Sequence, residues 1–114
     1  MRSFDRAAVL GALSKAWSLA SSSQWLPDNP AQGQCNVTAI LLHDLYGADV
    51  LKTSLPAGDH FYNRVNGDRV DLTASQFSEP VEYADVPASR EEALSGTSIE
   101  KYASLRSAYL ANLK

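Results

Sequence analysis

The single cysteine of the chain, Cys35, lies where a polar, glycine-containing segment (29–34) meets an apolar one. If the apolar segment is a helix, its unpaired N–H groups and its dipole stabilise a negative charge on a thiol at its start. His60 and Asp71 follow in a segment with the alternating pattern of a β-hairpin. A thiol, an imidazole and a carboxylate are the groups of a cysteine nucleophile site, so these three residues predict nucleophilic chemistry.

The predicted hairpin turns at Asn66-Gly67, a dipeptide typical of two-residue hairpin turns. Counting outward from the turn pairs Tyr62 with Asp71 and His60 with Thr73, and all four side chains then share one face. Asp71 becomes a diagonal neighbour of His60, about 7–8 Å away at the backbone, and can bind one ring nitrogen. The other nitrogen would face the thiol if the buried helix packs on this face.

The roles that follow are those of acyl transfer. A Cys35 thiolate attacks a carbonyl carbon, and His60 protonates the leaving group. The oxyanion that forms needs hydrogen-bond donors, for which we expect the Cys35 N–H and the side-chain amide of Gln32 or Gln34. The sequence thus predicts a cysteine-dependent hydrolase or acyltransferase that acts on an amide or thioester of a small molecule or short peptide. Four further residues are candidates for the pocket around these groups: Trp25, Asn29, Tyr62 and Asn63.

Other interpretations use the same residues. A lone cysteine at a helix start is often only a small buried apolar residue, and Asn63, on the opposite strand face, is expected to be structural. The polar cluster could also serve a non-catalytic module that binds a small molecule or a protein. A three-ligand zinc site of Cys35, His60 and Asp71 is a third alternative, although ligand spacings such as Cys-x-x-Cys and His-Glu-x-x-His are absent. We predict neither a metal nor a cofactor.

Length and composition predict one domain, residues 1–114, because domains cluster near 100–150 residues. The net charge of −3 gives no basic patch for a nucleic acid. One cysteine excludes an intrachain disulfide, which favours a reducing compartment. No apolar run has the length of a signal peptide or a membrane span, so we expect a cytoplasmic protein without a membrane partner. The oligomeric state stays open.

Periodicity and capping signals predict an α+β fold in which a central buried helix packs on a small antiparallel sheet, flanked by N- and C-terminal helices. Ser3 is the expected N-cap of the first helix, Gly47 ends the buried helix, and Ser89 opens a capping box for a short helix that Gly96 ends. The expected helices are 4–20, 35–46, a short one from Ser89 and a tail from Ile99 to Leu113. The expected strands are 48–53, 59–65, 68–73 and, with weaker alternation, 81–86.

Two stretches resemble a known family. The matching motifs lie between residues 25 and 77: Trp25, Asn29-Pro30-Ala31, Gly33-Gln34-Cys35, Val37-Thr38-Ala39, His60, Asn63-Arg64, Gly67, Asp71-Leu72-Thr73 and Gln76-Phe77. Together they resemble the YunG-like family of small, poorly characterised bacterial proteins, which tends to have tryptophan where this chain has Tyr62. More distantly, the order of cysteine, histidine and aspartate is similar to that of papain-like and transglutaminase-like enzymes. That similarity implies a papain/transglutaminase-like core, with Cys35 as nucleophile, His60 as acid or base and Asp71 as orienting group.

Overall fold

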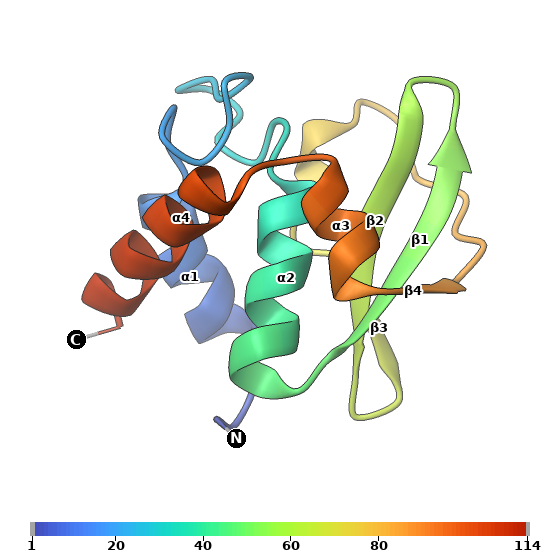
Figure 1. Ribbon diagram of the computed structural model, residues 1–114, viewed down its shortest axis with the longest axis horizontal. Coiled ribbons are helices and arrows are strands. Elements are labelled where there is room, and N and C mark those ends of the chain that lie inside the picture. Colours follow the sequence, from blue (N-terminus) through green and yellow to red (C-terminus); the bar gives the residue numbers. More distant parts are fainter. Residues whose placement is uncertain (1, 114) are drawn as a thin grey trace.

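The computed structural model describes residues 2–113 and has an α+β architecture (Figure 1). Its four strands form one sheet in the order β3-β2-β1-β4, in which every neighbouring pair is antiparallel. The prediction of α+β class with an antiparallel sheet is confirmed. In chain order the elements are α1 (Arg6–Ala16), α2 (Cys35–Tyr46), β1 (Asp49–Leu55), β2 (Gly58–Val65), β3 (Asp68–Val70), the 3-10 turn η1 (Ala74–Gln76), β4 (Val86–Ala88), α3 (Arg90–Ser95) and α4 (Ile99–Ala111).

Helix α2 is the centre of the molecule, as its apolar sequence predicted. It packs against the sheet, α3 and α4, and α4 and α1 lie on the side of it away from the sheet (Figure 1). The helix begins and ends at the predicted residues. Gly47 closes it because this residue has a φ of 69°, in the left-handed region that a glycine adopts without strain.

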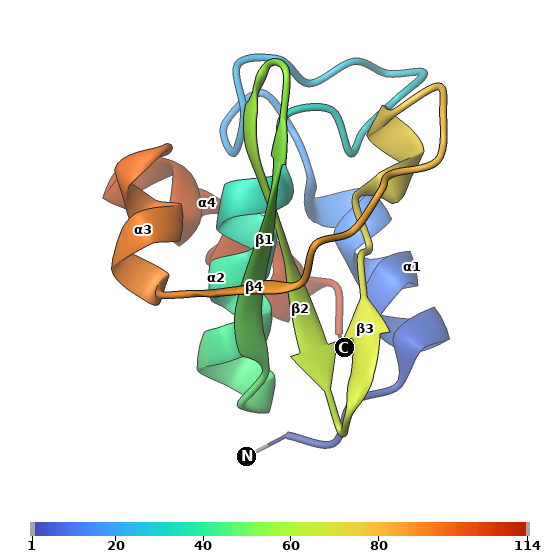
Figure 2. The same cartoon turned by 90° about the vertical axis from the view of Figure 1, so that its right-hand side faces the viewer.

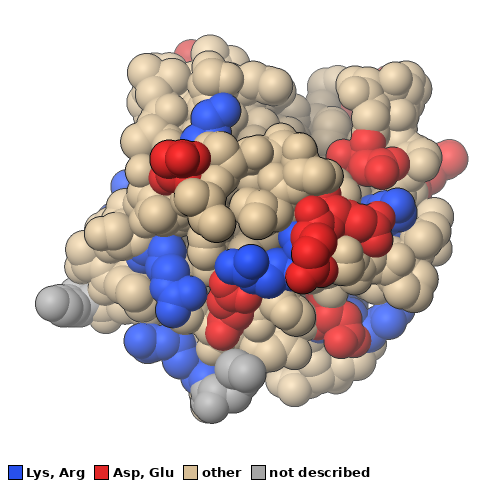
Figure 3. Space-filling view, in the orientation of Figure 1, with Lys and Arg blue, Asp and Glu red and all other residues tan. Residues whose placement is uncertain are grey.

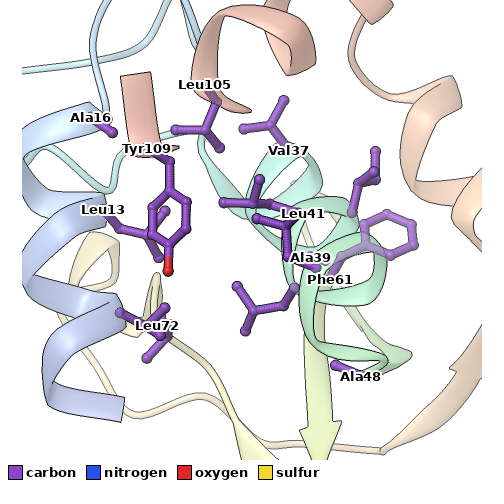
Figure 4. Packing of buried hydrophobic residues seen from close by; sticks show 14 of the residues in the cluster. Leu13, Ala16, Val37, Ala39, Leu41, Ala48, Phe61, Leu72, Leu105 and Tyr109 are labelled. Carbon is purple, nitrogen blue, oxygen red and sulfur yellow. The ribbon is translucent and has the colours of Figure 1, made fainter. Parts of the chain in front are cut away.

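The core lies between α2, the flanking helices and one face of the sheet. Figure 4 shows Leu13 of α1, Leu41 of α2 and Tyr109 of α4 pointing toward one another. All three side chains are fully buried. Phe61 of β2 meets α2 from the sheet side. This packing fixes α2 against β2, and it thereby fixes Cys35 relative to the strand that carries His60.

The β2–β3 hairpin has the register that its turn predicted, with Asn63 opposite Val70 and Val65 opposite Asp68. Asn66 and Gly67 have φ of 52° and 86°, the two positive values that a tight hairpin turn requires. The predicted extent of the second strand, to residue 73, is wrong: β3 ends at Val70. The reason is local, because the residues that follow fold back on the Asp71 side chain and enter η1.

Other predicted boundaries also need correction. The first helix starts after Asp5 rather than Ser3, because the Asp5 carboxylate accepts from the N–H groups of Ala7 and Ala8. It ends at Ala16 rather than 20. The strand predicted at 81–86 is wrong: Asp85 has a φ of 53°, which breaks an extended run, and β4 lies at Val86–Ala88. The capping box at Ser89 and the short helix that ends at Gly96 are confirmed.

Different elements pack on the two faces of the sheet. Asn63 donates to the carbonyl of Ala39 over 3.1 Å, which places its face of β2 against α2. Side chains alternate along a strand, so His60 and Tyr62 belong to the other face. The segment between η1 and β4 crosses that face, on the side of the sheet away from α2 (Figures 1 and 2). Within residues 2–113, no helix has the length and apolar character needed to cross a membrane.

Candidate functional site

A hollow opens where the N-terminal end of α2, the β1–β2 turn and η1 meet. In Figure 3 it is visible at the top of the molecule, between the segment that precedes α2 and the β1–β2 turn. Its volume is about 300 Å³, and we refer to it as the Cys35 cavity. Its polar and titratable lining consists of Gln24, Gln32, Cys35, Asn36, Asp59, His60 and Gln76. Two of the three predicted site residues thus line one cavity, although they lie on different elements.

The third residue, Asp71, binds the far side of the His60 ring. His60 Nε2 donates to Asp71 Oδ2 over 2.7 Å, and both side chains are almost completely buried. The ring is held from two more directions by Phe77, edge-on at 4.9 Å, and by Tyr62, stacked at 5.7 Å between ring centroids. His60 therefore has one orientation, with Nε2 committed to Asp71 and Nδ1 on the opposite side of the ring.

Asp71 is satisfied on both oxygens. Oδ1 accepts from the N–H and the hydroxyl of Thr73, each at 3.2 Å, and Oδ2 accepts from Tyr83 at 2.7 Å as well as from His60. Burial alone would raise the pKa of Asp71, but the His60 hydrogen bond and charge, with Tyr83 and Thr73, hold it below its usual value. Asp71 is consequently an anion at neutral pH despite its burial.

Tyr83 is a site residue that the sequence analysis missed. It reaches Asp71 from the segment over the outer face of the sheet, and burial followed by the Asp71 hydrogen bond raises the pKa of its phenol. Arg69 lies over its ring, 4.5 Å from the centroid. The weak alternation of the segment around Tyr83 carries no sequence signal of this contact, so only the fold could reveal it.

The thiol side of His60 is electrostatically coupled to Cys35. Burial alone would lower the pKa of His60, but the hydrogen bond to Asp71 and the interaction with Cys35 raise it to about 9. Nδ1 is buried, and within residues 2–113 it has no hydrogen-bond partner of normal geometry. At neutral pH the ring is therefore an imidazolium whose second N–H is available at the cavity.

The route by which Cys35 meets His60 differs from the predicted one. Helix α2 does not pack on the His60 face of the hairpin; it packs on the Asn63 face. Cys35 meets the ring because it is the first residue of α2, at the end of the helix next to the β1–β2 turn and η1. The half-buried thiol also contacts Asn36, with 3.2 Å from Sγ to Oδ1.

The first N–H groups of α2 have no capping side chain within residues 2–113, because the N-cap residue Gln34 makes no side-chain capping bond. Gln34 is fully buried and its amide donates to the carbonyl of Ser18 over 3.3 Å, so it faces away from the Cys35 cavity. Gln32 lines the cavity and accepts from Asn29 Nδ2 at 3.1 Å. Of the two predicted glutamines, the structure therefore places only Gln32 beside the thiol.

Gln76 of η1 is a second residue that the predicted site omitted. Its Oε1 accepts from the Gly33 N–H over 3.1 Å, which orients the amide. Its Nε2 is buried and has no partner among the described residues, yet Gln76 lines the Cys35 cavity. The residue belongs to the Gln76-Phe77 motif of the resemblance described above, which was the one sequence signal for it.

The four predicted pocket residues stand outside the Cys35 cavity. Asn29 positions Gln32, and Tyr62 supports the His60 ring. Trp25 is half-buried, and its buried Nε1 has no hydrogen-bond partner within residues 2–113. Asn63 bonds the backbone of α2 and of Asp49, which agrees with the structural role considered for it.

The zinc alternative does not fit this arrangement. Asp71 and Cys35 lie at opposite nitrogens of the His60 ring, so the three side chains do not converge on one point. Among residues 2–113 there is also no group of three or more His, Cys, Asp or Glu side chains that could hold a metal ion.

Comparisons with known proteins agree with the resemblance over a longer stretch. The YunG family model, described as YunG protein, matches residues 5–114. A Bacillus subtilis (strain 168) protein named "Uncharacterized protein YunG" is 44% identical over 97 residues, which cover 85% of this chain and 84% of that relative. No solved structure matches the chain.

Proposed function

The chain belongs to the YunG family, and we propose that it is a cysteine-dependent hydrolase or acyltransferase. The observation that carries the proposal is the connected set Asp71–His60–Cys35. A buried carboxylate fixes one nitrogen of a buried imidazolium, and the other nitrogen is free at the cavity that Cys35 lines. The imidazolium lies beside the thiol, where it can pair with the thiolate, the reactive form of a cysteine.

The proposed reaction has two steps. In the first, the Cys35 thiolate attacks the carbonyl carbon of an amide or thioester; a C–S bond forms, and the bond to the amine or thiol breaks as His60 gives that group its proton. In the second, His60 takes a proton from water, or from an acceptor amine, which attacks the acyl-cysteine. The acid or amide is released and the thiolate and imidazolium are restored.

The oxyanion that forms during each attack needs nearby donors. The N–H groups at the start of α2, including that of Cys35, can donate to the oxyanion from one side. The buried Nε2 of Gln76 can donate from a second side, since the Gly33 N–H binds Oε1 of the same amide and orients it. Gln32 is an alternative donor, because it lines the same cavity. These donors stabilise a negative charge that is present in the transition state and absent from the bound substrate, and such stabilisation accelerates the reaction.

The size of the Cys35 cavity supports a small substrate. A cavity of about 300 Å³ fits a small molecule or the end of a short peptide. We propose no nucleic acid or membrane partner and a cytoplasmic location. The chain order of cysteine on a helix start, then histidine and aspartate from a hairpin, is similar to that of papain-like and transglutaminase-like enzymes, and a core related to theirs is part of this proposal.

Acyl transfer to the protein tests the function. Wild type is incubated with p-nitrophenyl acetate and with acetyl and short-peptidyl thioesters, and its intact mass is followed with time. We expect one acyl group on Cys35, lost again in water or with an added amine, and none in Cys35→Ala. His60→Gln should slow acylation by about 10²–10⁴-fold, while the matched variant His43→Gln, on the exposed side of α2, should react like wild type.

Equal acylation in His60→Gln and His43→Gln would contradict the proposal. A binding module makes the opposite prediction: wild type would form no adduct, and ligand binding would survive Cys35→Ser.

A further inference from the structure

The Cys35 cavity continues into a second and larger depression. Between the β1–β2 turn and the segment after η1 lies a groove of about 570 Å³, which we call the Phe77 groove. The two spaces share the walls Leu55, Ala57 and Phe77. Since Phe77 also touches the His60 ring, the groove begins at the proposed reaction centre. A substrate that placed its carbonyl at Cys35 would extend a neighbouring group into this groove.

The walls of the groove are mostly apolar. Besides the three shared residues, they include Pro56, Pro80 and Val81. Such a surface gains free energy by covering the hydrocarbon part of a ligand. A fully polar ligand would lose water there without replacement contacts, so the groove favours a group with an aliphatic or aromatic stem.

The charged side chains on the groove are of one sign. Glu79 and Glu82 line it, and both residues are exposed. Within residues 2–113 neither makes an ion pair, whereas Asp59 on the adjoining cavity lies 3.7 Å from Lys52. Among residues 2–113, no lysine or arginine lines either space. Two uncompensated carboxylates at the end of an apolar path attract a cation.

We propose that the substrate is an amide or thioester with an apolar stem that ends in an amine or guanidine, as in a short basic peptide. This inference rests on the proposed function and names its substrate class. The stem lies along Leu55, Pro56 and Phe77, and the positive end lies near Glu79 and Glu82. Independently of these carboxylates, Nδ1 of the buried His60 lies beside Cys35 and has no hydrogen-bond partner of normal geometry within residues 2–113, which marks the adjoining cavity as a place for a polar ligand group.

Charged thiol reagents test the inference without turnover. Cys35 is modified with a cationic trimethylammonium-ethyl methanethiosulfonate, its anionic sulfonato-ethyl counterpart and the neutral methyl reagent, at low ionic strength. Each rate is divided by the rate with a free small thiol. The variants are Glu79→Gln/Glu82→Gln and, as a matched control, Glu100→Gln, which removes an exposed carboxylate at the start of α4.

We expect wild type to favour the cation over the anion. Each carboxylate should raise the rate of the cationic reagent and lower that of the anionic one, by roughly two- to threefold each. The double variant should therefore lower the ratio of the cation rate to the anion rate by roughly 15- to 80-fold. High salt should do the same, and Glu100→Gln should leave the preference unchanged. An anion preference, or a preference that the double variant does not alter, would overturn the substrate class while leaving the proposed function standing. If none of the reagents modifies Cys35, both proposals are wrong.

Discussion

Replacing Asp71 with asparagine should neutralise the His60 ring at physiological pH. In the wild type, the pKa of His60 is about 9, against 6.5 for an ordinary histidine. That difference of about 2.5 pH units corresponds to about 3.4 kcal/mol of preference for the imidazolium. Since burial alone lowers this pKa and Asp71 makes the first hydrogen bond that opposes it, Asp71→Asn should bring it below 7. The protonated fraction at pH 7.5 should then fall from nearly all to less than about a quarter.

The assay is an NMR titration of the histidine rings between pH 5 and 10. The chain has two histidines, so a His43→Gln background leaves the His60 ring as the one signal. Asp85→Asn is the matched control, because Asp85 bonds Tyr62 on the same side of the sheet and has no bond to His60. Its effect on the pKa of His60 should stay within about half a unit. A pKa of His60 near 6.5 in the wild type would refute the electrostatic account. So would the same pKa of His60 in Asp71→Asn and in Asp85→Asn.

Three further predictions concern stability, measured by urea unfolding. Because the pKa of His60 is raised on folding, its stabilisation should be complete below pH 6.5 and disappear toward pH 9, a loss of about 3 kcal/mol that His60→Gln should abolish. Asn63→Ala should lower the unfolding free energy by about 1–3 kcal/mol, since it removes two hydrogen bonds that the Asn63 amide donates. Asn112→Ala, at an exposed helix end, should cost less than about 1 kcal/mol. Gly33→Ala should destabilise by more than about 1 kcal/mol, because Gly33 has a φ of 73° and an added Cβ would collide with Ser22 Oγ. Gly11→Ala, in an open helical position, should stabilise, and the opposite order of these two glycine variants would contradict the packing described here.

The sequence was most informative where local signals act. Both ends of α2 follow from its apolar composition and from Gly47, and the hairpin register follows from Asn66-Gly67, because a two-residue turn leaves one pairing. From the hairpin register alone, the proximity of His60 to Asp71 could be predicted. The capping box of α3 belongs to the same class of short-range information.

Long-range contacts were the part that the sequence did not specify. Tyr83 reaches Asp71 from the weakly alternating segment 81–86, in which Asp85 interrupts the expected strand by taking a positive φ. The packing of α2 on the Asn63 face depends on the whole sheet, so alternation within the hairpin could not assign it. Likewise, the inward turn of Gln34 depends on Ser18, which is sixteen residues away in the chain.

The pH dependence of Cys35 alkylation by iodoacetamide tests the central claim most directly. If His60 and Cys35 form an imidazolium–thiolate pair, the wild-type rate should stay nearly level from pH 8.5 down to 6.5. In His60→Ala the rate should fall about tenfold for each pH unit below about 8.5, as for an ordinary cysteine. Parallel profiles in the two proteins, both rising through pH 8–9, would contradict the pairing and with it the proposed nucleophile.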